Sequence, residues 1–145
     1  MDLILWRHAE AEDGKPDLQR ELTEKGRKQA AEVAAWLLER LPNDFVIVSS
    51  PAARAMQTAQ ALGRDVKTDR TLAPGAPVDA IVKAAGWPTG ESTVVLVGHQ
   101  PDFGAALACL VAGKQADWSL EKAGLWWLSG QPVRVRAVVS PDLLL

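Results

Sequence analysis

Short apolar runs alternate with helical stretches along most of the chain. Residues 3–6, 45–48 and 93–97 are apolar or nearly so and show no polar alternation, which is typical of strands that are buried on both faces. The intervening and following stretches predict helices, over residues 24–41, 51–62, 78–85 and 101–112. Strands that alternate with helices predict βαβ units and a mostly parallel sheet.

Local signals place the ends of these elements. Thr23 has the character of an N-cap, and Pro42 follows the first helix as a stop. Pro51 is expected at the first position of the second helix, since proline is favoured there. The polar stretch 9–21 contains Gly14 and Pro16 and is predicted to be a loop.

The last part of the chain predicts two more strands, over residues 124–128 and 133–139, joined by a turn. Their closeness in sequence favours an antiparallel hairpin at one edge of the sheet. A short extended piece is expected at residues 66–68 and a turn at 72–77. The predicted fold class is α/β: a three-layer sandwich whose mostly parallel central sheet has helices on both faces and an antiparallel edge strand.

Composition narrows the choice of function. The chain has 145 residues, 48% of them hydrophobic and 23% charged, which fits one domain over residues 1–145. A formal charge of −2 argues against binding to nucleic acid or to a membrane surface. One cysteine and two histidines exclude an internal disulfide and argue against a zinc site. We expect no metal, no cofactor and, without a leader or a membrane span, a cytoplasmic location.

Chemically capable residues follow three of the predicted strands. Arg7 and His8 come after the first, Ser49–Pro51 with Arg54 after the second, and His99 after the third. Because ligands of open α/β sheets bind beyond the carboxyl ends of the strands, these side chains should meet. Arginine forks and the amino-terminal ends of helices bind phosphate, and a neutral imidazole can attack phosphorus. The pattern therefore predicts a site for a compact dianion, most simply phosphate.

Each residue alone has a plainer interpretation. His8 could be a strand-end histidine bonded to a loop, and His99 a turn residue. Arg54 could be a solvated helix residue, and Arg7 a surface partner of a nearby glutamate. The functional interpretation depends on all four residues lying just beyond the carboxyl ends of predicted strands.

Four segments resemble the signatures of the histidine phosphatase superfamily, the phosphoglycerate mutase-like proteins. Residues 5–10 (LWRHAE) resemble its RHG or RHA motif, 49–59 (SSPAARAMQTA) its SSPxxRAxQTA motif, and 97–101 (VGHQP) its GHxP motif. Residues 20–26 (RELTEKG) are similar to its RxLTxxG segment. The small size and the tail look most like the SixA branch, the small phosphohistidine phosphatases. The resemblance covers nearly the whole chain.

The resemblance implies a role for each matching residue. His8 corresponds to the nucleophile that becomes phosphohistidine, and Arg7, Arg54 and His99 to the rest of the phosphate pocket. Attack requires an uncharged nitrogen on His8, so its other nitrogen should be held by a hydrogen bond, for example to a backbone carbonyl. His99 is expected to be cationic or a hydrogen-bond donor. Arg20 and Glu10 are expected at the rim of the phosphate pocket.

The sequence offers no convincing general acid. Asp69 and Asp79 are the only carboxylic acids in residues 68–83. The carboxylates at positions 10, 12 and 13 are better explained as solvated loop residues. An alkoxide leaves poorly without a proton, whereas imidazole takes one readily near neutral pH. This favours a phosphohistidine substrate on a protein, with inorganic phosphate as product, and predicts a role in signal transduction. The alternatives are a small-molecule phosphomonoesterase or mutase of the same superfamily and, more remotely, a non-catalytic phosphate-binding regulatory module.

Overall fold

The computed structural model describes residues 1–144 and contains one six-stranded sheet. Its order is β3-β2-β4-β1-β5-β6. The first four of these strands are parallel, β5 is antiparallel to β1, and β6 is antiparallel to β5. The strands are β1 (Asp2–Arg7), β2 (Phe45–Ser49), β3 (Val66–Thr68), β4 (Thr93–Gly98), β5 (Leu125–Ser129) and β6 (Arg134–Val139). The expected parallel sheet with an antiparallel hairpin at one edge is confirmed.

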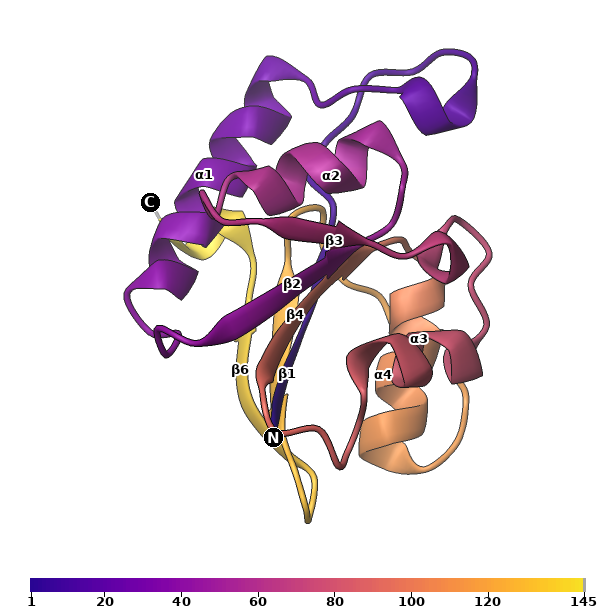
Figure 1. Ribbon diagram of the computed structural model, residues 1–145. Helices are drawn as coiled ribbons and strands as arrows, with labels where there is room; N and C mark the ends of the chain where they lie inside the picture. Colours follow the sequence, from indigo (N-terminus) through magenta and orange to yellow (C-terminus); the bar gives the residue numbers. More distant parts are fainter. Residues whose placement is uncertain (145) are drawn as a thin grey trace.

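Helices cover both faces of this sheet, as predicted. The helices α1 (Glu24–Leu38) and α2 (Ala53–Gln60) lie on one face, and α3 (Val78–Ala85) and α4 (Asp102–Ala112) on the other (Figure 1). In β1, Ile4 and Trp6 pack in the cluster under α1 and α2, while Leu3 and Leu5 pack in the cluster under α3 and α4. Both faces of β1 are therefore buried, which explains the absence of polar alternation in that run.

Four predicted helix boundaries are wrong. α2 ends at Gln60 rather than Leu62, and α4 begins at Asp102 rather than Pro101. α2 begins at Ala53 rather than Pro51. The Ser50 hydroxyl accepts the Ala52 N–H (3.2 Å), so residues 50–52 form a turn that delays the helix. α1 ends at Leu38 rather than Leu41, because the N–H groups of residues 40 and 41 both turn back to the Leu37 carbonyl. The Thr23 cap is confirmed, since its side chain accepts the N–H of residue 26.

Gly26, in the RxLTxxG segment, sets the distance between α1 and the loop that follows β1. A Cβ atom at this position would collide with the backbone carbonyl oxygen of Glu10. The first turn of α1 therefore packs directly on the backbone two residues beyond His8. Glycine here is a requirement of close packing and not of an unusual φ angle.

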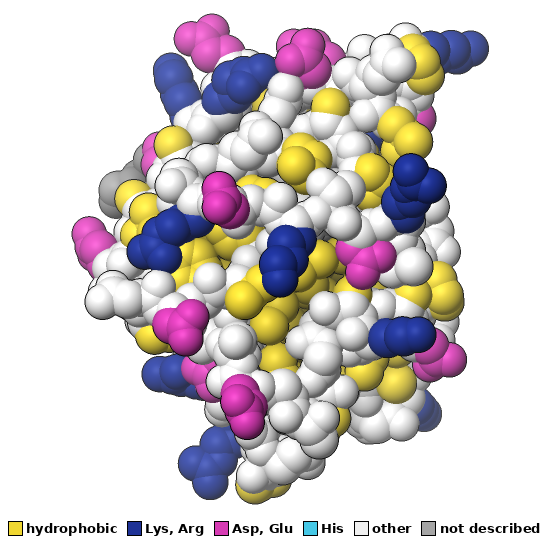
Figure 2. Space-filling view, in the orientation of Figure 1, with side chains coloured by type: hydrophobic (Ala, Val, Ile, Leu, Met, Phe, Trp, Pro, Cys, Tyr) yellow, Lys and Arg dark blue, Asp and Glu magenta, His cyan; other side chains and the backbone are white. Residues whose placement is uncertain are grey.

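One face of the molecule has a hollow of about 410 Å³ between β2, β3, β4 and α3, with mixed apolar and polar walls (Figure 2). Val46, Val48 and Val94 line it, with Lys67 and Glu91 at its border. Neither histidine is visible on this face. Within residues 1–144, no helix combines the length and apolar character needed to cross a membrane.

Candidate active site

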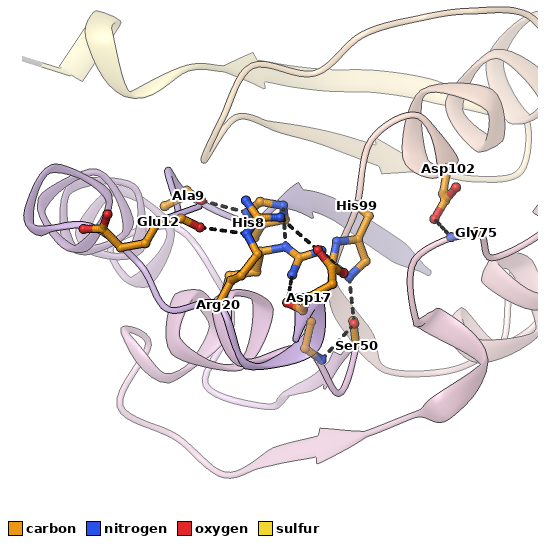
Figure 3. A network of polar contacts seen from close by, with 11 residues as sticks. His8, Ala9, Glu12, Asp17, Arg20, Ser50, Gly75, His99 and Asp102 are labelled. Carbon is orange, nitrogen blue, oxygen red and sulfur yellow. Dashed lines mark hydrogen bonds and ion pairs between the residues drawn. The ribbon is translucent and has the colours of Figure 1, made fainter. Parts of the chain in front are cut away.

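Both histidines lie at the carboxyl ends of neighbouring parallel strands. Arg7 of β1 is in register with Gly98 of β4, and the next residue of each strand is a histidine. The His8 N–H donates to the Gly98 carbonyl (3.0 Å), and the two imidazole centroids are 5.2 Å apart (Figure 3). The sheet therefore brings the two rings into one pocket, as the positions in the sequence predicted.

His8 has a defined tautomer. Its Nδ1 lies 2.7 Å from the Ala9 carbonyl oxygen, which can only accept, so Nδ1 carries the proton. Its Nε2 faces the Arg54 Nε at 3.3 Å and accepts that N–H. Burial, aided by the charges of Arg54, Arg7 and Arg20 and opposed by the Ala9 bond, lowers the pKa of His8 to about 4. The ring is therefore neutral at pH 7 with its lone pair on Nε2, and the expected bond to a backbone carbonyl is confirmed.

His99 is held differently. The ring is buried, and its Nε2 lies 2.8 Å from the hydroxyl oxygen of Ser50, a group that can donate or accept. Burial and the proximity of His8 and Arg54 lower the pKa of His99 to about 3, against the opposing effect of Asp17. Of the two expected states of His99, cation or hydrogen-bond donor, the desolvated site and its neighbouring cations favour a neutral ring that donates. Donation from a neutral ring is compatible with the geometry.

Arg54 links His8 to the loop after β1. It lies on the first turn of α2, only 4% exposed, and its Nη1 donates to the Asp17 carbonyl at 2.8 Å. Its Nη2 forms an ion pair with the Asp17 carboxylate at 3.1 Å. Thr58, one helical turn further on, accepts the Ala9 N–H (3.0 Å) and donates to the Arg54 carbonyl (2.8 Å). The QTA part of the second motif thus holds the backbone next to the nucleophile candidate.

Arg7 bonds to the segment before β5 and leaves one N–H unpaired within residues 1–144. Its Nη1 donates to the Leu120 carbonyl (2.8 Å), while its buried Nε has no hydrogen-bond partner among the described residues. Burial lowers the pKa of Arg7, and the charge of Glu121 opposes this. A buried unpaired guanidinium N–H is rare, and an anion would satisfy it. A groove of about 630 Å³ opens beside Arg7, lined by Glu10, Lys25, Lys28, Gln29, Glu32, Glu121, Lys122, Pro141 and Asp142.

The backbone before β5 closes around the nucleophile candidate. The N–H of Ala123 donates to the His8 carbonyl (3.1 Å), and the carbonyl of Ala123 accepts the Trp6 indole N–H (2.8 Å). Ala123 is fully buried and has a φ of +60°, in the left-handed region that favours glycine.

The two residues expected at the rim have different environments. Arg20 donates from Nε to the Glu12 carbonyl (2.7 Å) and from Nη1 to the Asp17 carboxylate (2.9 Å). The Glu10 carboxylate accepts the Thr23 hydroxyl (2.8 Å) and is thereby tied to the start of α1. Arg20 is thus connected to the predicted phosphate pocket through Asp17, whereas Glu10 faces the groove beside Arg7.

Sequence reasoning missed Asp17 and did not give Ser50 a role of its own. Ser50 is part of the second motif, so its proximity to His99 had a sequence signal. Asp17 had none, because it lies in an aperiodic polar loop. Together the charged groups Arg7, Arg20, Arg54 and Asp17 carry a formal charge of +2, from three cations and one anion. This excess of positive charge favours an anion at the site. Among residues 1–144, no group of three or more His, Cys, Asp or Glu could hold a metal ion.

Comparison with known proteins gives a consistent family assignment. Residues 3–75 match the model of the histidine phosphatase superfamily (branch 1). A protein of Picosynechococcus sp. with no described function is 32% identical over 157 residues, which cover 100% of this chain and 94% of the relative.

Solved structures share the fold over almost the full length. A SixA protein from Agrobacterium tumefaciens is 26% identical with a TM-score of 0.81, over 97% of this chain and 98% of that one. A protein histidine phosphatase SixA complexed with tungstate is 22% identical with a TM-score of 0.88, over 100% of both chains. A mycobacterial glucosyl-3-phosphoglycerate phosphatase is 27% identical with a TM-score of 0.72, over 96% of this chain and 97% of that one. The chain therefore belongs to the histidine phosphatase superfamily (branch 1) and is an enzyme of the phosphatase type.

Proposed function

We propose that the protein removes phosphoryl groups through a phosphohistidine intermediate on His8. The observation that carries this proposal is the bond between His8 Nδ1 and the Ala9 carbonyl (2.7 Å), which puts the lone pair on Nε2, the nitrogen that would attack once phosphate takes the place of the Arg54 N–H. The low pKa of His8 keeps that lone pair unprotonated at neutral pH.

The reaction has two steps with one nucleophile. In the first, Nε2 of His8 bonds to phosphorus while the bond from phosphorus to the leaving group breaks and the leaving group takes up a proton. In the second, water bonds to phosphorus, the Nε2–P bond breaks, and inorganic phosphate departs as the water gives up a proton. Arg7, Arg54 and His99 stabilise the charge on the equatorial oxygens of the transferring group.

The substrate that fits best is protein phosphohistidine. Bonds from Arg20 and Arg54 hold the pKa of the Asp17 carboxyl below its usual range, so it is ionised and is a poor acid near neutral pH. The Glu10 carboxylate is bonded to Thr23, and Asp69 accepts from the N–H and hydroxyl of Thr71. A leaving imidazole is more basic than an alcohol and depends less on an enzyme acid. The SixA proteins among the similar structures support the same choice.

A second candidate is a phosphatase of small phosphorylated molecules. The groove of about 630 Å³ beside Arg7 has the size of small-molecule sites, and a similar solved structure is a glucosyl-3-phosphoglycerate phosphatase. Such a substrate would place its phosphate at His8 and the rest of the molecule in the groove.

One set of assays separates these candidates. The rate constant kcat/KM is measured for a phosphohistidine-carrying protein and for sugar, nucleotide and amino-acid monophosphates, and the phosphoenzyme is trapped and its modified residue mapped. We expect the highest kcat/KM on phosphohistidine and label on His8. A higher kcat/KM on a small ester would favour the second candidate, and turnover without label on His8 would refute the mechanism.

A further inference from the structure

The carboxylate of Asp17 is bound to two arginines of the phosphate pocket. Its Oδ2 lies 3.1 Å from Arg54 Nη2, and its Oδ1 lies 2.9 Å from Arg20 Nη1. The Asp17 carbonyl also accepts from Arg54 Nη1 (2.8 Å), so a single residue engages both terminal nitrogens of that guanidinium. Figure 3 shows Asp17 beside His8 and between Arg20 and His99.

This carboxylate is charged, and its field reaches the pocket. The bonds from Arg20 and Arg54 lower the pKa of Asp17, and its negative charge opposes the depression of the His99 pKa. Its side chain is 55% exposed and belongs to a short turn, Asp17–Gln19, within the long polar loop. Unlike the buried Arg54, it can therefore turn into solvent without loss of core packing.

Asp17 and a phosphate dianion need the same donors. A phosphoryl group in contact with His8 Nε2 must take the place where Arg54 Nε now donates, and a bidentate arginine contact would use a second N–H of the same fork. We propose that Asp17 is an internal counter-anion of the pocket, which competes with phosphate for Arg54 and thereby weakens retention of the phosphate product. This inference rests on the proposed function, because it takes the pocket to be a phosphate site.

The charge of Asp17 also lowers the attraction of the pocket for an anion. Besides Glu121, whose negative charge acts on Arg7, the side chains of Arg7, Arg20, Arg54 and Asp17 sum to +2 when Asp17 is ionised. Without that charge they sum to +3, and a dianion would be held more tightly.

The test is the affinity for inorganic phosphate, measured by isothermal titration and as product inhibition. Asp17→Asn keeps the shape and an acceptor oxygen but removes the charge, and Asp17→Glu restores the charge. Asp13→Asn is the matched control, because Asp13 is an exposed carboxylate of the same loop whose side chain makes no hydrogen bond or ion pair among residues 1–144. Thermal unfolding of each variant reports on the fold.

We expect Asp17→Asn to bind phosphate roughly three- to tenfold more tightly, as a like charge is removed beside the anion. Asp13→Asn should change the affinity less than about twofold, and Asp17→Glu should remain close to the wild type. Weaker binding by Asp17→Asn would mean that the carboxylate positions Arg54. Unchanged binding would mean that the carboxylate does not compete with phosphate. Either result would overturn the proposal that Asp17 is a counter-anion. Absence of phosphate binding in every variant would overturn the proposed function as well.

Discussion

His8 and His99 occupy corresponding positions at the ends of two paired parallel strands, yet their rings are held by different kinds of group. Nδ1 of His8 meets a carbonyl oxygen, which only accepts, so its tautomer is fixed with the lone pair on Nε2, where it accepts the Arg54 Nε–H. Nε2 of His99 meets the Ser50 hydroxyl, which can donate or accept, so the ring can be neutral or cationic without losing that bond. In the proposed mechanism, the hydrogen-bond partner, more than the strand position, is what gives attack to His8 and charge stabilisation to His99.

The largest expected effect separates the two histidines directly. His8→Ala should abolish phosphoenzyme formation, with a loss in kcat of at least about 10⁴-fold, because the nucleophile is gone. His99→Ala should lower kcat by about 10²- to 10³-fold, as expected for the loss of one group that stabilises the transition state. Rapid-quench measurement of labelled enzyme checks both. If His99→Ala abolished the label while His8→Ala kept it, the assignment would be reversed.

A smaller effect is expected from the group that holds His99. Ser50→Ala removes the hydroxyl 2.8 Å from Nε2 and should lower kcat about tenfold, with KM changed less. Ser49→Ala is the control, because that buried hydroxyl donates to the Ser50 carbonyl and has no bond to either histidine. Equal losses in the two variants would indicate a structural cause and would contradict the positioning role of Ser50.

Thr58 supports the backbone next to His8, as Ser50 supports the ring of His99. Thr58→Val preserves the shape but leaves the buried Ala9 N–H without its acceptor, at a cost of roughly 1–3 kcal/mol in stability. Because the Ala9 carbonyl orients His8, we also expect a drop in kcat of about threefold. Chemical denaturation and steady-state kinetics measure the two effects, and a variant as stable as the wild type would show that the Ala9 contact contributes little.

The last expected effect concerns the pH dependence of stability and does not act on catalysis. The pKa values of about 4 for His8 and about 3 for His99 lie below the unfolded value near 6.5, so the unfolded chain binds protons that the folded chain does not. The free energy of unfolding should therefore rise with pH between about 4 and 6.5, by about 1 kcal/mol per pH unit for each histidine. Tm measured over this range, with His99→Gln and His8→Gln as comparisons, checks the slope. A slope unchanged in both variants would rule out the histidines as its source.

Much of the fold was predictable because its strands are short apolar runs. The residues with reactive or anion-binding side chains follow these runs directly in the sequence. His8 and His99 meet for a reason visible in the sequence: each follows a strand, and parallel strands end at the same edge. The start of α2 was not predictable, because Pro51 favours a helix start locally while Ser50 is drawn into a turn with Ala52 and towards His99.

The contact between Asp17 and Arg54 was equally inaccessible. It joins residues 37 positions apart, across a loop with no hydrophobic period to fix its course. The neutral state of His99 also depends on the burial and the neighbouring charges that only the folded chain supplies.

The two hydrogen bonds that the backbone of Ala123 makes to residues 6 and 8 have a consequence for mutational tolerance. The position bears no reactive group, yet it is fully buried, has a φ of +60° and bonds on both sides to the segment that ends in His8. Glycine fits there, while β-branched and large residues meet both a strained backbone and a filled core. In a saturation survey of this chain, Ala123 would stand out as sharply as the histidines. Intolerance to substitution would then reveal where the nucleophile's backbone is anchored and not where the reaction takes place.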